Sequence, residues 1–506
     1  MQSINEPLLG SSSSSAAVKK KLKKVVDHGK KKAEPGVVMY RDDDGNVRPM
    51  PPTMSAWYNL YCAEHCEELT PNFEAKFRRR FRLPHAEYKK LVGFAVEDSM
   101  KVTGYFTRWR PGRTNVAGVP TSPIELLILT SLRYLGRGWT FDDLEESTAI
   151  SEEVIRIFFH QFIAWGSEFL YTEHVRPPVS FEEAQNTLEE YKLAGFTGCV
   201  GSMDASHVEH SRITYRHRQA HLSFKLPFTA RTYNLICNHR RKIFCTTDGH
   251  PARWNDKSLV RFDKLATALH EGTHPLCNLV FELYAKGENG QEPVKQKYKG
   301  GWLLVDNGYL NWGVTIPPLK QTATIPEWRF SKWLESMRKD VECTFGILKG
   351  RWRVLKAGIR VHGTAASDMI WKTCCALHNM LLEVDGIAED YSSDWLGEMG
   401  AFNSEDVPEA VRRLLNSTTT GFQLYDVSGM GAGEDGDEDE EDEDSEDEEE
   451  FKGSIEEEEG AIVVRKMSMT DFRKRLIDHF DICFQRKEIA WPSQRMKGVA
   501  AEPKIN

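Results

Sequence analysis

Two short, largely apolar segments of this chain each run directly into an aspartate. Residues 196–204 end at Asp204, and residues 302–306 end at Asp306. The second segment is continuously apolar, which is typical of a strand buried on both faces of a sheet. The chain is therefore predicted to fold around a sheet in which two strands end in an acidic residue.

Strand and helix patterns are mixed over residues 196–385. Residues 233–238 and 242–248 predict two strands on either side of a short basic turn. Residues 337–355 and 369–382 have the spacing of helices, and the second of these is apolar nearly all round. Strands mixed with helices indicate an α/β domain, which we place at 196–385.

Residues 56–195 predict a mainly helical domain. A helix around residues 73–81 has one apolar and one basic face. Further along, Thr140 and Ser151 are placed to cap two helices that a short turn separates, which is the outline of a helix-turn-helix. The second of these helices carries few basic residues, so the unit fits either DNA binding or ordinary packing.

The two ends of the chain differ from its centre in composition. Residues 1–55 predict a disordered basic arm, either a nuclear-import or phosphate-binding segment or a plain solvated tail. Residues 386–460 predict a linker with a disordered acidic tract, because residues 434–459 hold 19 Asp and Glu against one Lys. Residues 461–506 predict a helical tail that docks back or binds a partner.

The acidic tract hides the charge of the rest of the chain. The whole chain has a net charge of −9, but without the tract 65 Lys and Arg remain against 56 Asp and Glu. A basic body suits a polyanionic partner. The ten cysteines include no Cys-x-x-Cys pair, which indicates reduced thiols. No apolar stretch approaches the length of a membrane span, so no membrane association is expected.

Three carboxylates form the candidate catalytic and metal-binding set. Asp204 and Asp306 come from strands, and Glu342 comes from the helix that begins near residue 337. Oxygen ligands suit hard divalent ions, and two such ions can drive phosphodiester cleavage. We therefore expect two Mg²⁺ or Mn²⁺ ions at this set. Each acid alone is more often a turn residue or part of a solvated helix face.

Other polar residues are candidates for supporting roles. Lys349 and Arg353 share the helix face of Glu342, with Arg351 between them, and all three are candidate DNA-phosphate contacts. His207 either orients a ligand near Asp204 or makes a structural hydrogen bond, and Asp256 is either a supporting acid or an ordinary loop acid.

One cysteine–histidine pair raises the question of zinc. Cys374 and His378 lie one helical turn apart, but they supply only two ligands on an apolar helix, so core packing is favoured.

Several motifs together resemble one family. They are Gly201-Ser-Met-Asp204-Ala-Ser-His207, Leu304-Val-Asp306-Asn-Gly-Tyr309, the run from Val341 to Arg353 with Glu342, Leu377-His378-Asn379, and Trp254-Asn-Asp256. Over about residues 70–385 the chain resembles the PIF/Harbinger superfamily of transposases, the plant-transposon-type DDE endonucleases. The 35 residues between Asp306 and Glu342 match the family's spacing.

The resemblance implies an RNase H-like fold, nuclear action and excision of DNA at terminal inverted repeats. It also implies assembly of the protein as a homo-oligomer on DNA and a separate Myb-like DNA-binding partner protein. The chain departs from the family at Cys343, where arginine is common, and in a long interval between its first two acids. Residues 266–299 in that interval predict an inserted helix and loop.

Two other functions remain open from the sequence. A domesticated, catalytically silent transposase would keep the fold for binding DNA or chromatin, and the acidic tract favours this slightly. The intact set of three acids argues against it, because clustered carboxylates without metal repel phosphate. A nuclease of the same fold that acts on RNA is the third interpretation.

Overall fold

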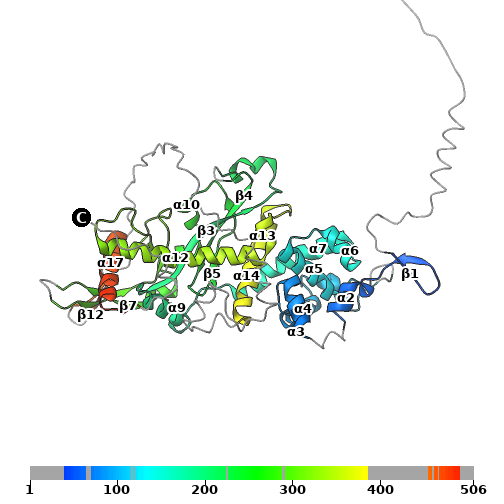
Figure 1. The fold of residues 1–506 in the computed structure, drawn as a ribbon, viewed down its shortest axis with the longest axis horizontal. Coiled ribbons are helices and arrows are strands. Elements are labelled where there is room, and N and C mark those ends of the chain that lie inside the picture. The colour runs from blue at the N-terminus through cyan, green and yellow to red at the C-terminus, as the bar shows by residue number, and fades with distance from the viewer. Residues whose placement is uncertain are drawn as a thin grey trace, which may run out of the picture.

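The computed structural model describes residues 39–63, 70–114, 118, 120–223, 226–287, 291–385, 454–458, 461–464 and 467–489. These residues form an elongated molecule, with helices from the N-terminal half at one end, a mixed sheet in the middle and a second sheet at the other end (Figure 1). None of the helices within these ranges is long and apolar enough to cross a membrane.

Part of the predicted disordered arm is folded. Strands β1 (Met39–Arg41) and β2 (Val47–Pro49) pair in an antiparallel hairpin, and η1 (Pro52–Met54) follows. The prediction of disorder over 1–55 is therefore wrong from residue 39 onward, because the Asp-Gly turn at 42–46 closes a hairpin. The lysine clusters of the arm lie outside the described residues.

The helical region is built from short helices. They are α2 (Ala56–Tyr61), α3 (Pro71–Phe81), α4 (His85–Met100), η3 (Thr107–Trp109), α5 (Ile124–Arg137), α6 (Phe141–Thr148), α7 (Glu152–Trp165), η4 (Gly166–Leu170), α8 (Tyr171–His174) and α9 (Phe181–Leu193). Apart from α9, whose Ala184 and Tyr191 belong to a second core, these helices pack their apolar side chains into one core, as in the edge-on contact of Trp57 with Phe81 at 5.2 Å between ring centroids.

The helix-turn-helix outline is present in α6 and α7. Thr140 caps α6 in a capping box with Asp143, as predicted. Ser151 makes no side-chain cap at α7, which corrects the prediction. The Glu145 carboxylate instead accepts the backbone N–H of Glu152 at 2.6 Å. α7 buries four aromatic side chains on its inner face, so packing already accounts for its pattern.

The central sheet is mixed. Its strands are β3 (Cys199–Glu209), β4 (Ala230–Cys237), β5 (Ile243–Thr246), β6 (His250–Pro251), β9 (Trp302–Leu304) and β10 (Thr315–Ile316), in the order β10-β9-β3-β4-β5 with β6 beside β4. β3, β9 and β10 run parallel, whereas β4 is antiparallel to β3 and β5. A mixed sheet covered by helices agrees with the predicted RNase H-like fold.

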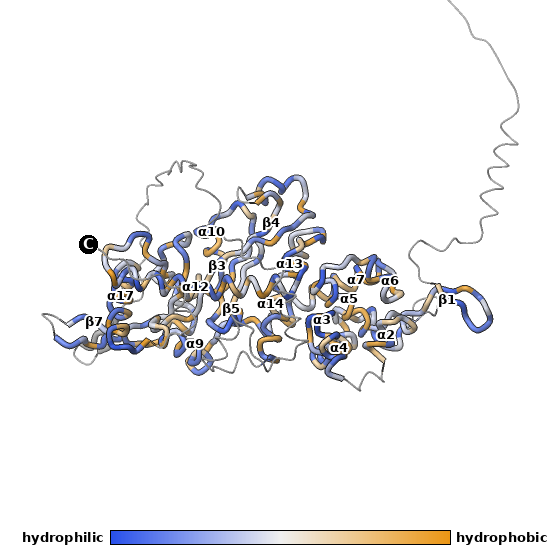
Figure 2. Tube along the Cα trace, viewed as in Figure 1, coloured by the Kyte–Doolittle hydropathy of each residue, from blue (hydrophilic) through white to orange (hydrophobic). Residues whose placement is uncertain are grey.

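Alternation along β4 places side chains in two separate cores. Tyr233 and Leu235 face the core shared with the helical region, and Ile236 faces the other core. Both faces are buried, which explains the continuously apolar strands. Most residues of the apolar segments α5 and α14 are buried, while the turn of the β1 hairpin is hydrophilic (Figure 2).

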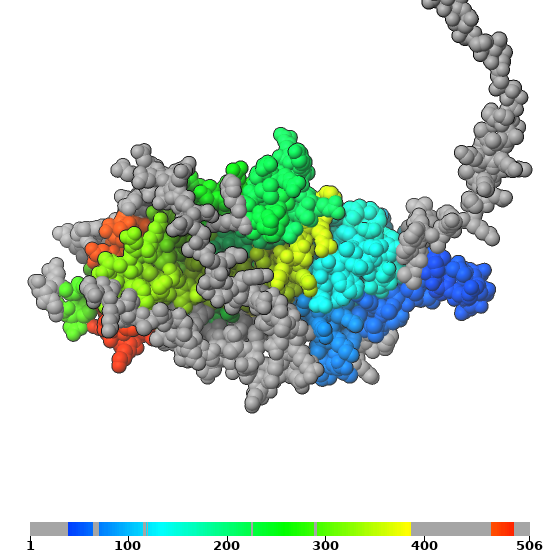
Figure 3. All heavy atoms as spheres, turned by 45° about the horizontal axis from the view of Figure 1, so that its top comes forward, coloured from blue at the N-terminus to red at the C-terminus, as the bar shows by residue number. Residues whose placement is uncertain are grey.

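Three helices after the sheet cover it. They are α12 (Ile325–Arg351), α13 (Arg353–Ala357) and α14 (Thr364–Val384). α12 begins at residue 325 rather than near 337, because Thr324 and Glu327 form a capping box there. The helical region continues directly into the surface of α13 and α14 (Figure 3). The boundary at residue 195 therefore remains a prediction, since packing runs across it.

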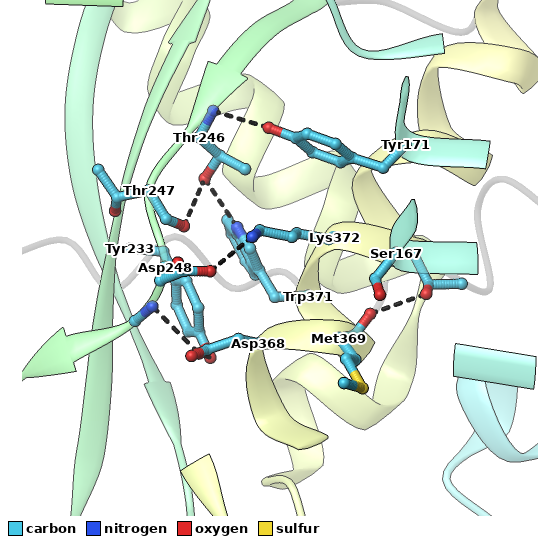
Figure 4. Close-up of polar contacts among 12 residues, drawn as sticks. Ser167, Tyr171, Tyr233, Thr246, Thr247, Asp248, Asp368, Met369, Trp371 and Lys372 are labelled. Carbon is cyan, nitrogen blue, oxygen red and sulfur yellow. Dashed lines mark hydrogen bonds and ion pairs between the residues drawn. The ribbon is translucent and has the colours of Figure 1, made fainter. Parts of the chain in front are cut away.

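Polar contacts join α14 to the sheet (Figure 4). The Trp371 Nε1 donates to Thr246 Oγ1 at 2.8 Å, and the Trp371 ring stacks on Tyr233 at 4.5 Å between centroids. Asp368 accepts hydrogen bonds from Arg231 and from the Tyr233 hydroxyl. Burial raises the pKa of Asp368, and these donors offset part of that effect.

The second sheet corrects two predictions. α10 (Asp256–Val260), α11 (Lys264–His270) and η7 (Pro275–Asn278) precede a hairpin of β7 (Val280–Ala285) and β8 (Val294–Lys299), where a helix and loop were expected. β11 (Ser454–Glu458) and β12 (Ala461–Val464) extend it in the order β12-β11-β8-β7. The end of the acidic tract and the start of the predicted helical tail are therefore strands.

The C-terminal helix docks on the domain, as one of its two predicted alternatives required. α17 (Met469–Gln485) buries Phe472 and Phe480 against the second core. Contact is close at Gly195, which has φ +88°, because a Cβ there would lie 2.7 Å from the Phe480 ring. The helix thereby ties the end of the chain to the junction of α9 and β3.

Candidate active site

The two aspartates occupy equivalent places on neighbouring strands. Ser202 of β3 pairs in register with Leu304 of parallel β9, and each aspartate lies two residues further along its segment. Side chains two residues apart share a face, and parallel strands lie about 4.8 Å apart. Asp204 and Asp306 are therefore neighbours at one edge of the sheet. β3 itself continues to Glu209 through its pairing with β4. The prediction that Asp204 lies at the end of its strand is therefore wrong.

An arginine brings the third acid to this edge. Arg338 Nη1 contacts Asp204 Oδ2 at 2.8 Å, and Arg338 Nη2 contacts Glu342 Oε1 at 2.8 Å. The arginine and the glutamate are one turn apart on α12, so the helix presents both toward β3. The structure thus places Asp204 and Glu342 on two sides of one guanidinium, next to the strand position of Asp306.

The three acids and Arg338 shift the pKa values of Asp204 and Arg338. Burial raises the pKa of Asp204 to about 6, the Arg338 charge opposes that rise, and the charges of Asp306 and Glu342 add to it. Burial alone would lower the pKa of Arg338, but the three acids outweigh it and raise that pKa. All three carboxylates therefore act on the same cation.

A tight turn holds Asp306. Its Oδ1 accepts the backbone N–H of Gly308 at 2.8 Å. A Cβ at Gly308 would lie 2.7 Å from Asp256 Oδ2 and 3.0 Å from Asp306 Oδ1, so a larger residue would have to displace these carboxylates. Asp256 is thus close to Asp306, in the place that its predicted supporting role requires, and that role itself remains a prediction.

A buried hydrogen-bond chain supports the same turn and was missed from the sequence. The Tyr309 hydroxyl donates to Asn234 Oδ1 at 2.7 Å, and Asn234 Nδ2 donates to Asp263 Oδ2 at 2.8 Å. Asp263 also accepts the first backbone N–H groups of α11. The Asp-Asn-Gly-Tyr motif carries the tyrosine, but its two partners lie in segments with no distinctive local pattern.

Two residues near Asp204 have structural contacts. His207 Nδ1 lies 2.7 Å from Thr232 Oγ1 across the sheet, and which of its two predicted roles it has remains a prediction. Lys349 Nζ donates to Ser206 Oγ and to the His207 carbonyl, both at 2.7 Å. Burial lowers the pKa of Lys349 to about 8. Lys349 thus links α12 to β3, and its predicted contact with DNA phosphate remains a prediction.

The other two predicted phosphate contacts lie near an arginine cluster. We define the arginine cluster as five residues from three remote segments: Arg79, Arg82, Arg137, Arg351 and Arg353. Burial and the charges of the other four lower the pKa of Arg82 to about 10. Arg353 is exposed, whereas burial lowers the pKa of Arg351 to about 10. Of the predicted residues, Arg353 is the one whose exposure suits a phosphate contact.

The carboxylate oxygens of the site are suitable ligands for a hard divalent cation, although in this structure two of the acids contact Arg338. Asp204 and Glu342 aim one oxygen each at a single positive charge, and oxygen ligands are what Mg²⁺ and Mn²⁺ require. Among the described residues, no three His, Cys, Asp or Glu side chains are close enough together to hold a metal. The pair Cys374 and His378 is buried in α14, with His378 Nε2 3.0 Å from the Arg241 carbonyl, as core packing predicted.

Fold and site together define a class. A mixed sheet with one acid on a strand, a second acid just after the neighbouring parallel strand and a third acid on a covering helix agrees with the RNase H-like fold that the sequence predicted. Residues 203–379 match the family model described as DDE superfamily endonuclease, and all three acids lie within the match. This part of the chain is a DDE superfamily endonuclease domain of the Harbinger transposase type. No curated protein and no solved structure matches the chain.

Proposed function

We propose that the protein is a transposase-like, metal-dependent DNA endonuclease and strand transferase that cuts at terminal inverted repeats. The observation that carries the proposal is the bridge from Asp204 through Arg338 to Glu342, beside the in-register position of Asp306. Remote carboxylates that share one half-buried cation form a site suited to positive charge. The family match supplies the phosphodiester as the substrate class.

The three acids would hold the metal ions. When bound, two Mg²⁺ or Mn²⁺ ions would activate the attacking oxygen and stabilise the leaving oxygen. The chain's own contribution is position. The register of β3 with β9 sets the two aspartates side by side, and the turn at Gly308 fixes the direction of Asp306. α12 carries Glu342 to the same edge.

The arginine cluster supports a DNA substrate. It lies where α3, α5 and the start of α13 meet, and at least Arg79 and Arg353 are exposed. Exposed guanidinium groups bind phosphates without reading sequence, which would position the duplex. Action in the nucleus, a homo-oligomer on the inverted repeats and a Myb-like DNA-binding partner protein belong to the same proposal and rest on the family resemblance.

Nicking of a DNA that contains the element's own inverted repeat tests the proposal. The wild-type protein should nick it with Mg²⁺ or Mn²⁺ and not with a chelator, and Asp306→Asn should abolish nicking. Asp248→Asn, an exposed acid paired with Lys372, is the control and should nick normally. Wild-type rates from Asp306→Asn would refute the assignment, and faster cleavage of RNA–DNA hybrids would favour the RNA nuclease.

A second candidate function has one observation in its favour. Arg338 contacts both Asp204 and Glu342, and among the described residues no three His, Cys, Asp or Glu side chains are close enough together to hold a metal ion. A domesticated protein that binds DNA or chromatin without cutting it would look the same. Calorimetric titration with Mn²⁺ separates the two functions: the nuclease requires saturable binding that Asp204→Asn removes, and the silent binder requires none.

A further inference from the structure

Arg338 sits at the inner edge of the acid site. Its side chain is 16% exposed, as is that of Asp204, whereas that of Glu342 is 47% exposed. The half-buried aspartate lies within the paired part of β3, and the glutamate is the more exposed acid. Two carboxylates this near each other repel, so the arrangement needs a cation between them.

The arginine satisfies only part of its own hydrogen-bonding capacity. Its Nη1 and Nη2 each meet a carboxylate, but its Nε is buried without a hydrogen-bond partner. A buried donor without a partner costs free energy. The guanidinium therefore contacts both acids but leaves its Nε without a hydrogen bond, whereas an arginine with a purely structural role commonly has partners for all its nitrogens.

We infer that Arg338 is the resident counter-ion of Asp204 and Glu342, and that a divalent cation competes with it for these two carboxylates. The inference rests on the proposed function, because it requires these acids to be metal ligands. It extends that function by assigning Arg338, a residue with no role in the family resemblance described above, as a positioning residue that sets metal affinity.

The Arg338 guanidinium and a divalent metal ion cannot bind the same two carboxylate oxygens at the same time. A guanidinium spans two carboxylates with a different nitrogen for each, which keeps their oxygens apart. Mg²⁺ draws its ligand oxygens to about 2.0–2.1 Å, so the same two oxygens cannot serve both cations at once. Lys349, the other cation that α12 directs at β3, is held by Ser206 and the His207 carbonyl and does not substitute.

The test is Mn²⁺ binding by the full-length protein, measured by calorimetry for the wild type and for Arg338→Gln. Removal of the competing charge should tighten Mn²⁺ binding at least about tenfold. Without metal, Arg338→Gln should melt at a lower temperature than the wild type, because two carboxylates lose their cation. Saturating Mn²⁺ should then raise its melting temperature by more than it raises that of the wild type.

Arg329→Gln is the matched control. Arg329 lies on the same helix, is 6% exposed and contacts Asp481 at 2.8 Å, so its loss also breaks a buried ion pair. This variant should lose stability but keep the wild-type Mn²⁺ affinity. A folded Arg338→Gln protein that binds Mn²⁺ no more tightly than the wild type overturns the inference.

A second variant, Arg338→Lys, tests the same inference if Arg338→Gln does not fold. Arg338→Lys keeps one positive charge but cannot bridge two carboxylates in a fork, so its Mn²⁺ affinity should exceed that of the wild type by a smaller factor. Wild-type affinity or weaker would contradict the competition. If neither the wild type nor the Arg338 variants bind Mn²⁺, the proposed function itself fails. If the wild type binds Mn²⁺ and the variants bind no more tightly, only the role of Arg338 fails.

Discussion

The acid site and the arginine cluster bring like charges together in opposite ways. At the acid site, one internal guanidinium contacts Asp204 and Glu342, and all three acids raise its pKa. In the arginine cluster, burial and the neighbouring arginines lower the pKa of Arg82 to about 10. The acids thus have a cation inside the protein, whereas the cluster gathers cations that disfavour one another.

The difference indicates which charges the protein neutralises with its own groups and which charges are left for a ligand to neutralise. A group of like charges persists only if other interactions or a partner compensate it. Arg338 compensates the acids in the absence of metal. For the arginine cluster, exposure of Arg79 and Arg353 leaves compensation to a polyanion such as DNA.

The largest effect is expected at the exposed member of the acid site. Glu342→Gln keeps the shape of the side chain but removes its charge, and it should reduce nicking at least about a hundredfold. Glu335→Gln, which affects a partly exposed glutamate of the same helix paired with Lys332, is the control and should nick at the wild-type rate. Equal rates for both variants would mean that Glu342 is an ordinary surface residue. Folding of each variant is checked by circular dichroism.

Protonation of the acid site should appear in the pH dependence of stability. The folded-state pKa of Asp204 is about 6, above its ordinary value of 3.8, so the folded protein binds this proton more tightly than the unfolded chain. Without metal, the free energy of unfolding should therefore fall as pH rises from about 4 to about 6, with about 2 kcal/mol from this group.

Urea unfolding in a chelating buffer measures this contribution as the difference between the wild type and Asp204→Asn. The asparagine variant lacks the titration and should be less sensitive to pH over the same range. Parallel pH profiles for the two proteins would show that Asp204 is not desolvated in solution as the structure has it.

The arginine cluster should affect binding rather than chemistry. The double variant Arg79→Ala, Arg353→Ala should bind duplex DNA about tenfold more weakly and lower the salt slope of binding by about two, because each phosphate contact adds about 0.9. Fluorescence anisotropy over a range of salt concentrations gives both quantities. Lys90→Ala, an exposed cation of α4 paired with Glu87, is the control for net charge. An unchanged slope in the double variant would place DNA elsewhere.

The sequence predicted those parts of the fold that depend on local pattern. Apolar runs such as 302–306 indicated buried strands, and amphipathic spacing around Phe472 and Phe480 indicated the terminal helix. The proximity of Asp204 and Asp306 agrees with their predicted place on neighbouring strands, although only Asp306 follows the end of its strand. The catalytic roles of these residues and of Glu342 remain predictions.

Features that depend on remote partners could not be predicted. β3 runs past Asp204 because β4 pairs with it as far as Glu209, and the 280–299 hairpin gains a third strand from residues 454–458. The arginine cluster likewise joins three distant segments. Arg338 is the exception: its spacing of four from Glu342 on a predicted helix was a visible signal for an ion pair.

The smallest effect should come from Lys349, which the sequence assigned to phosphate binding. Its ammonium group faces Ser206 and the His207 carbonyl, so Lys349→Met should leave DNA affinity within about twofold of the wild type and should not change the salt slope of binding. Loss of two hydrogen bonds should lower the free energy of unfolding by about 1 kcal/mol, measured by urea denaturation. A salt slope reduced by about one in this variant would instead return Lys349 to the phosphate-binding surface. Lys349 would then belong with the cations that bind DNA, and not with those that hold α12 against the sheet.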